Sequence, residues 1–309
     1  MNIVVMGECM VELSSTDTNV FYQGFAGDVY NTAVYLKRLM AQECKVSILT
    51  AVGFGELSKD MLNAFKQECI NTELVAKIED KQPGLYMIKT ADDGERSFSY
   101  WRENSAAKQM LSCLSESQKI QLEHHTDIFY FSGISLAILD EKDRGCFWRL
   151  IQSLKQQNTK IVFDTNYRSV LWRSKYEAKD LYHQAFSVSD IVFPGGEDFH
   201  LLYGIESFDV IADYLSAYSI PEIIIKNGVQ GIMCISPQRQ EFVEAKAVDQ
   251  IVDTTSAGDA FNAGYLSARL AGKGMSEAAA YGALLAAFVI QHRGAIVNFT
   301  DFTDFIHSH

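Results

Sequence analysis

A run of small residues that ends in a carboxylate is the part of the chain best suited to chemistry. The run is Asp253-Thr254-Thr255-Ser256-Ala257-Gly258-Asp259, at the expected first turn of a helix. Because Ala257 and Gly258 have almost no side chain, the backbone amides of residues 257–259 can come close to a ligand. The first amides of a helix lack intrahelical partners and lie at the positive end of its dipole, so we expect an anion to bind here.

Asp259 needs its own explanation, because a carboxylate repels an anion that is bound beside it. A general base that takes the proton from a hydroxyl attacking a phosphoryl group would need this position. The alternative is that Asp259 is a helix-start residue favoured by the dipole, and that Gly258 is an ordinary loop residue. Taken alone, the run leaves both interpretations open.

A second group of polar residues lies between an expected strand and the first expected helix. Gly27 lets the backbone approach a ligand, and Asp28 and Asn31 can pair with hydroxyl groups as acceptor and donor. The alternative is a simple turn in which Asp28 caps the helix.

The segment from 72 to 102 lacks a helical period and predicts a β-hairpin with an Asp-Gly turn at 91–94. Tyr86 belongs to its first strand. By the period of two, one face of the second strand carries Arg96, Phe98, Tyr100 and Arg102. A face with tyrosine and arginine suits a polar, anionic small molecule beneath a lid, and the alternative is a solvated strand face.

Asn166 and Arg168 follow an apolar strand that ends at Asp164. Open α/β sheets bind ligands at the carboxyl ends of their strands. Arg168 and Arg102 could together hold a carboxylate, since guanidinium groups match its geometry. The alternative for Arg168 is an ordinary surface position.

Two further segments could bind a nucleotide. Lys226, Gly228 and Gly231 follow another apolar strand and could line a phosphate or ribose, or simply form a hairpin loop. Small residues at 282–283 and 293–295 could shape an adenine pocket, or allow close packing of helices.

The elements that must position these residues alternate between strand and helix patterns. Nearly continuous apolar strands between helices predict a mostly parallel sheet covered on both faces. The exceptions are β insertions at about 10–25 and 71–105. We find no linker rich in proline, glycine or serine, so residues 1–309 are expected to form a single domain.

Composition excludes several classes of protein. The formal net charge of -12, without any basic run, argues against nucleic-acid and anionic-membrane partners. Six scattered cysteines predict free thiols in a reducing cytoplasm, and the seven histidines lack zinc-ligand spacing. No G-x-x-x-x-G-K-[ST] run is present, and Gly53-Phe54-Gly55 is an incomplete dinucleotide fingerprint, which disfavours a nicotinamide dehydrogenase.

Taken in order, these motifs resemble those of the ribokinase-like (PfkB) carbohydrate kinases over essentially the whole chain. Residues 24–31 resemble the N-terminal signature and residues 253–259 the C-terminal one. The resemblance implies a three-layer, Rossmann-type α/β fold with a small β-sheet lid, and transfer of the ATP γ-phosphate to a sugar hydroxyl. It makes Asp259 the catalytic base and the amides of Ala257, Gly258 and Asp259 the anion hole. ATP would contact Lys226, Gly228, Gly231, Ser256, Ala257 and Gly258, Mg²⁺ would accompany it, and a monovalent cation such as K⁺ could activate the enzyme.

Within that family the motifs are most similar to those of 2-keto-3-deoxygluconate kinases, which act on the 6-hydroxyl of a sugar acid. The similar segments are Pro83-Gly84-Leu85-Tyr86, residues 94–102, residues 132–137 and Asp164-x-Asn166-Tyr167-Arg168. The resemblance implies that the sugar acid is held by Gly27, Asp28, Asn31, Tyr86, Tyr100, Arg102, Asn166 and Arg168. The alternatives are a fructokinase, ribokinase or nucleoside kinase of the same fold, and a sugar-binding sensor without catalysis.

The sequence departs from the family pattern at two places. Ser256 stands where many members have glycine, and residues 194–198 lack the asparagine of the N-x-x-E element. Asp198 is then a candidate for organising Mg²⁺ through water. An exposed β lid often serves as a dimer interface, so a homo-oligomer, dimeric or larger, is also expected.

Overall fold

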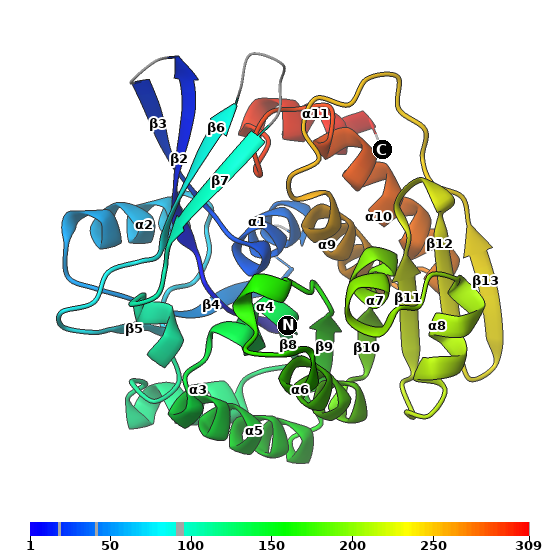
Figure 1. The fold of residues 1–309 in the computed structure, drawn as a ribbon, viewed down its shortest axis with the longest axis horizontal. Helices are drawn as coiled ribbons and strands as arrows, with labels where there is room; N and C mark the ends of the chain where they lie inside the picture. Colours follow the sequence, from blue (N-terminus) through cyan, green and yellow to red (C-terminus); the bar gives the residue numbers. More distant parts are fainter. Residues whose placement is uncertain (18–19, 41–42, 91–95, 309) are drawn as a thin grey trace.

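A nine-stranded, mostly parallel sheet forms the centre of the computed structural model, which describes residues 1–17, 20–40, 43–90 and 96–308 (Figure 1). Its strand order is β13-β12-β11-β10-β9-β8-β1-β4-β5. The strands are β1 (Asn2–Met6), β4 (Lys45–Val52), β5 (Val75–Lys77), β8 (Ile128–Ser132), β9 (Lys160–Asp164), β10 (Ile191–Phe193), β11 (Glu222–Lys226), β12 (Ile232–Ser236) and β13 (Arg239–Val243). Among the described residues, its antiparallel pairs are β11 with β12 and β12 with β13, at one edge. The predicted parallel sheet is therefore confirmed.

Helices cover both faces of this sheet, because its strands carry apolar side chains on both sides. In β1, Ile3 and Val5 face one apolar core, whereas Val4 and Met6 face the other. The first core is closed by α1 (Asp28–Met40), α2 (Glu56–Gln67), α9 (Ala257–Leu270), α10 (Met275–Val289) and α11 (Phe299–Ser308). The second is closed by α3 (Glu116–His124), α4 (Gly133–Ile138), α5 (Glu141–Gln156), α6 (Lys175–Val188), α7 (Gly196–Tyr203) and α8 (Phe208–Leu215). Short 3₁₀ turns are η1 (Ala106–Gln109), η2 (Ser169–Leu171) and η3 (Gly228–Gln230).

A second, four-stranded sheet stands away from the large one, at the upper left of Figure 1. Its order is β3-β2-β6-β7, with β2 (Met10–Asp17), β3 (Val20–Ala26), β6 (Leu85–Thr90) and β7 (Arg96–Trp101). From the predicted range 71–105 it takes the strands β6 and β7, whereas β5 pairs with β4 in the large sheet. The predicted turn at 91–94 lies outside the described residues.

Two glycines set the distance between α9 and α10. A Cβ on Gly264 would lie 2.9 Å from the Cα of Gly282, and one on Gly282 would lie 2.7 Å from the carbonyl oxygen of Phe261. The small residue at 282 therefore serves close helix packing rather than an adenine pocket. In the described part of the chain, no helix is long and apolar enough to cross a membrane.

Candidate active site

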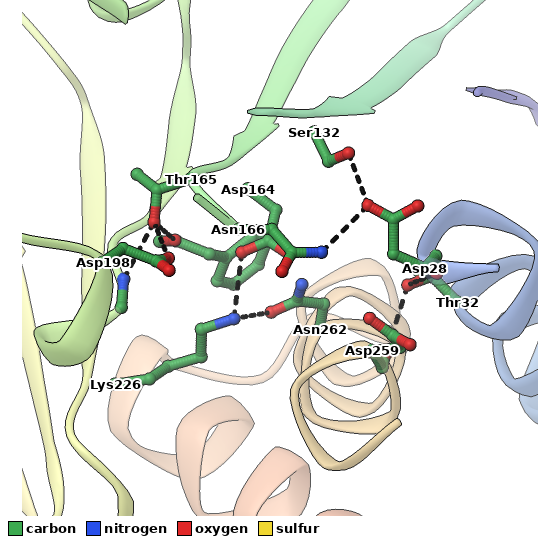
Figure 2. Close-up of polar contacts among 12 residues, drawn as sticks. Asp28, Thr32, Ser132, Asp164, Thr165, Asn166, Asp198, Lys226, Asp259 and Asn262 are labelled. Carbon is green, nitrogen blue, oxygen red and sulfur yellow. Dashed lines mark hydrogen bonds and ion pairs between the residues drawn. The ribbon is translucent and has the colours of Figure 1, made fainter. Parts of the chain in front are cut away.

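The carboxyl ends of the parallel strands and the start of α9 meet at one edge of the large sheet. β8 ends at Ser132, β9 at Asp164 and β11 at Lys226, and the first turn of α9 lies opposite them (Figure 2). Parallel strands all point the same way, so their ends bring polar residues from distant parts of the chain to this edge. The predicted site residues in the second half of the chain gather here.

The start of α9 is the segment predicted to bind an anion. Ser256, which precedes the helix, has a φ of 66°, in the left-handed region that favours glycine. Its Oγ is buried and has no hydrogen-bond partner among the described residues. The amide of Ala257 donates to the carbonyl of Thr254 at 3.3 Å, whereas the backbone at Gly258 is exposed. Exposed first-turn amides can accept an anionic ligand.

Asp259 lies in this first turn and is only 9% exposed as a residue. Its Oδ2 accepts a hydrogen bond of 2.8 Å from Nδ2 of Asn31. The pKa of Asp259 is raised to about 8, first by burial and then by the nearby carboxylate of Asp28, while the hydrogen bond from Asn31 opposes the shift. A carboxylate with this proton affinity is suited to accept a proton from a hydroxyl.

Asn31 and Gly27, both predicted to bind substrate, also make contacts within the protein. The amide nitrogen of Asn31 is engaged by Asp259, and its Oδ1 accepts the backbone N–H of Gly27 at 3.4 Å. A Cβ on Gly27 would overlap the carbonyl oxygen of Glu8, so close backbone packing already requires glycine there. Asn31 thus holds the carboxylate of the predicted base through one of its amide N–H groups.

Asp28 and Asn166, both predicted to bind substrate, are brought together. Asp28 is the first residue of α1, and its Oδ2 accepts the hydroxyl of Ser132 at 2.5 Å and Nδ2 of Asn166 at 2.9 Å (Figure 2). Burial raises the pKa of Asp28, whereas these two donors oppose that shift. Figure 2 places Asp28 beside Asp259, and this pair of acids explains part of the raised pKa of Asp259.

Lys226 lies between β11 and the start of α9. Its Nζ is 3.1 Å from Oδ1 of Asp164 and 2.8 Å from Oδ1 of Asn262 (Figure 2). A Cβ on Gly258 would be 3.7 Å from the same Nζ, so the ammonium lies next to the expected anion hole. This position keeps Lys226 a candidate for contact with a phosphoryl group.

Gly228 and Gly231 belong to the loop that joins β11 to β12. They have φ values of 55° and 98°, and a Cβ on Gly231 would lie 2.8 Å from the carbonyl oxygen of Val243. Chain reversal and close packing require glycine at these positions. The hairpin-loop alternative accounts for both residues.

The two predicted carboxylate-binding arginines differ in their surroundings. Arg168 is 54% exposed, donates to the carbonyl of Tyr167 at 2.9 Å and lies 3.9 Å from Oδ1 of Asp198. Arg102, directly after β7, is only 14% exposed, and its Nη2 forms an ion pair with Oε2 of Glu8. Arg168 therefore faces solvent, whereas Arg102 is held at the base of the small sheet.

Tyr86 and Tyr100 face each other across β6 and β7, as the hairpin predicts. They are paired in register, and their rings stack with centroids 5.9 Å apart. The hydroxyl of the buried Tyr86 donates to Glu12 on β2, while Tyr100 is exposed. This face of the small sheet therefore carries two stacked tyrosine rings, and the hydroxyl of one of them is bonded to Glu12.

Asp198 uses both carboxylate oxygens within the protein. Oδ2 accepts the hydroxyl of Thr165 at 2.6 Å, and Oδ1 accepts the amide of Tyr167 at 2.9 Å. Burial raises its pKa to about 6. These contacts hold the segment that carries Asn166 and Arg168. Within the described ranges no three His, Cys, Asp or Glu residues form a metal-binding group.

Sequence reasoning missed Glu8, Tyr130 and Asn262. Asn262 lies three residues after Asp259, on the same side of α9, and its Nδ2 donates to the hydroxyl of Tyr130 at 2.8 Å. That helical spacing is a signal for Asn262. Glu8 is a lone acid in the apolar run from Ile3 to Val11, which is a weaker signal of a buried polar contact.

The comparisons with known proteins agree on one family of kinases. Residues 1–301 match the family described as pfkB family carbohydrate kinase. The chain is 37% identical to a 2-dehydro-3-deoxygluconokinase of Dickeya dadantii and 39% identical to one of Escherichia coli, in each case over 96% of both chains. The structure is similar to that of 2-dehydro-3-deoxygluconokinase from Thermotoga maritima, with a TM-score of 0.84 at 19% identity over 96% of this chain and 94% of that one. Aminoimidazole riboside kinase from Salmonella enterica, bound to its riboside and an ATP analog, gives a TM-score of 0.83 at 20% identity over 99% of each chain.

Proposed function

Because the chain belongs to the pfkB family of carbohydrate kinases, we propose that it phosphorylates a sugar acid, 2-keto-3-deoxygluconate, on the 6-hydroxyl with ATP. The observation that carries this proposal is Asp259, a buried carboxyl group with a pKa near 8 in the first turn of α9. The names of the 37–39% identical relatives support the substrate, which is also called 2-dehydro-3-deoxygluconate.

In the proposed reaction Asp259 takes the proton of the 6-hydroxyl. The hydroxyl oxygen forms a bond to the γ-phosphorus as the bond between the β- and γ-phosphates breaks, and ADP leaves. The amides at the start of α9 and the ammonium of Lys226, which is beside Gly258, stabilise charge on the transferring group. Mg²⁺, when bound with ATP, neutralises phosphate charge.

The substrate's carboxylate is assigned to Arg102 and Arg168. Arg168 follows β9, which ends at the site, and Arg102 is held by Glu8 at the small sheet. A neutral sugar would not need two cations. Asp28 and Asn166 would pair with sugar hydroxyls, and Tyr86 and Tyr100 would cover the sugar from the small sheet.

Three further features belong to the proposal. The carboxylate of Asp253 accepts the amides of Thr255 at 2.9 Å and Gly294 at 2.8 Å, which brings together two segments whose carbonyls could bind a monovalent cation.

Phe21 and Trp101, exposed on the small sheet, support a homo-oligomer formed through that sheet. The six free thiols support a reducing compartment such as the cytoplasm.

An ADP-release assay with Mg-ATP tests the proposal. The acceptors compared are 2-keto-3-deoxygluconate, fructose, ribose and adenosine, and the Asp259→Asn variant, purified in parallel, controls for contaminating kinases. We expect turnover with the sugar acid alone. Preferred turnover of a neutral acceptor would select a different kinase of this fold, and absence of turnover with all four would favour a sugar-binding sensor.

A further inference from the structure

Glu8 is a buried acid at the joint between the two sheets. It lies between β1 of the large sheet and β2 of the small one, and its side chain is 2% exposed. Both carboxylate oxygens have partners: Oε2 accepts Nη2 of Arg102, and Oε1 accepts the hydroxyl of Ser105. Burying a carboxylate costs free energy unless such partners compensate it.

Three of the segments that carry the family resemblance meet at this residue. A Cβ on Gly84, just before β6, would lie 2.6 Å from Oε1 of Glu8. A Cβ on Gly27, just before α1, would overlap the Glu8 carbonyl oxygen. Arg102 follows β7 and supplies the ion pair. The position of Glu8 thus explains why two of these segments require glycine at the contact point.

We propose that Glu8 is a positioning residue for Arg102 and thereby fixes recognition of the substrate's carboxylate. Arginine has five N–H donors, and Glu8 engages its guanidinium through Nη2, which leaves other donors for a ligand. The arginine is then ordered before the substrate arrives, so binding does not have to immobilise a long side chain. This inference rests on the proposed function, because it takes Arg102 as the partner of the sugar acid.

A purely electrostatic role for Glu8 predicts the opposite change in KM, so the two roles can be told apart. If Glu8 only neutralised Arg102, removing its charge would strengthen the attraction between Arg102 and an anionic substrate. If Glu8 orders the guanidinium, removing it weakens substrate binding. The sign of the change in KM therefore distinguishes positioning from simple neutralisation.

The test compares Glu8→Ala and Glu8→Gln in the wild type and in an Arg102→Ala background. We expect Glu8→Ala to raise the KM for 2-keto-3-deoxygluconate about tenfold with a smaller change in kcat and an unchanged KM for ATP. In the Arg102→Ala background the same change should have no further effect on KM. Glu8→Gln keeps the volume and is expected to raise KM about threefold, which covers the case in which the alanine variant does not fold.

Glu68→Gln is the matched control. Glu68 also forms a partly buried ion pair with an arginine, Arg38, which extends from α1 toward α2 and contacts the carbonyl of Val297. Its loss should lower the melting temperature and leave the KM for the sugar acid unchanged. Thermal unfolding of all variants shows which changes in KM accompany a loss of stability.

The outcomes separate this inference from the proposed function. A wild type that does not phosphorylate 2-keto-3-deoxygluconate overturns both. If the wild type does so, a KM that falls or stays the same in both Glu8 variants overturns the role of Glu8 alone. Equal effects of Glu8→Ala with and without Arg102 would also overturn it, because the residue would then not act through the arginine.

Discussion

The hydrogen bond from Asn31 to Asp259 predicts how the pH dependence of the kinase can be moved. Asn31→Ala removes the 2.8 Å bond to the Asp259 carboxylate. Asn31 opposes the rise in the pKa of Asp259, so its loss should raise that pKa above the value of about 8. Since the base must be ionised to accept a proton, activity at neutral pH should fall.

The size of the effect follows from the strength of such a bond. A hydrogen bond to a charged group contributes about 1.5 kcal/mol or more, and one pKa unit corresponds to about 1.4 kcal/mol. A pKa that moves from about 8 to about 9 lowers the ionised fraction at pH 7.5 from roughly one quarter to roughly one thirtieth. The expected loss in kcat/KM at that pH is therefore about eightfold.

The assay is the pH profile of kcat/KM for the sugar acid, at saturating Mg-ATP, for wild type and Asn31→Ala. This quantity reports ionisation of the enzyme before the sugar binds. The acid limb should shift to higher pH by about one unit, and the two profiles should converge at high pH. Asn31→Asp is unsuitable as a control because it adds a charge, so Thr32→Ser, which keeps a hydroxyl near the backbone carbonyl of Asp259, serves instead.

Two results would refute this reasoning. An equal loss of kcat/KM at every pH would mean that Asn31 positions substrate or base without changing proton affinity. An acid limb that stays in place, with a raised KM for the sugar alone, would return Asn31 to the predicted role of hydroxyl binding.

Three other variants test separate parts of the site. Asp259→Asn should nearly abolish turnover but raise the melting temperature at pH 8 by at least ~2 °C, with no such rise at pH 4. The reason is that the pKa of Asp259 is about 8 in the folded protein against an ordinary 3.8, so the stability of the wild type falls as pH rises between those values. Equal melting temperatures of the two proteins at pH 8 would contradict the raised pKa. Gly27→Ala should cost about 1–3 kcal/mol in urea unfolding because its Cβ overlaps the Glu8 carbonyl, and an unchanged midpoint would contradict that packing. Lys226→Met should lower both melting temperature and kcat, and adding Asp164→Asn should restore stability but not kcat; recovery of kcat would make Lys226 purely structural.

The alternation of strands and helices was predictable because each element carries its own period of apolar residues. The run Ile3–Val5 indicates a strand buried on both faces, and the Val29-to-Met40 spacing indicates one apolar helix face. The short β5 was not separated from the small sheet, because three residues carry no period that could tell which sheet they join.

Within the site, the chemical role of a residue was predictable from the local sequence, but the residue with which it forms a hydrogen bond was not. A carboxylate after Ala257-Gly258 indicates a base at a helix start from local sequence alone. Its donor Asn31 is 228 residues away, and Glu8 is 94 residues from Arg102. No local propensity reports such pairs, so Asn31 was predicted to face a ligand and Glu8 was overlooked. Gly228 and Gly231 show the reverse case, in which a motif consistent with phosphate binding is explained by loop geometry.

The three acids at the sheet edge, Asp28, Asp164 and Asp259, differ in the groups that compensate their charge. Asp164 is paired with the ammonium of Lys226, and Asp28 accepts hydrogen bonds from a serine and an asparagine. Asp259 is buried close to the other two acids. In the described part of the chain its carboxylate accepts one hydrogen bond, from the side-chain amide of Asn31. Hydrogen bonds and the ammonium of Lys226 therefore compensate the charges of Asp28 and Asp164, whereas Asp259, with one such bond, has a pKa raised to about 8. That acid is also the one at the start of α9, where an attacking hydroxyl would have to lose its proton, so the same network that organises the edge of the sheet selects its base.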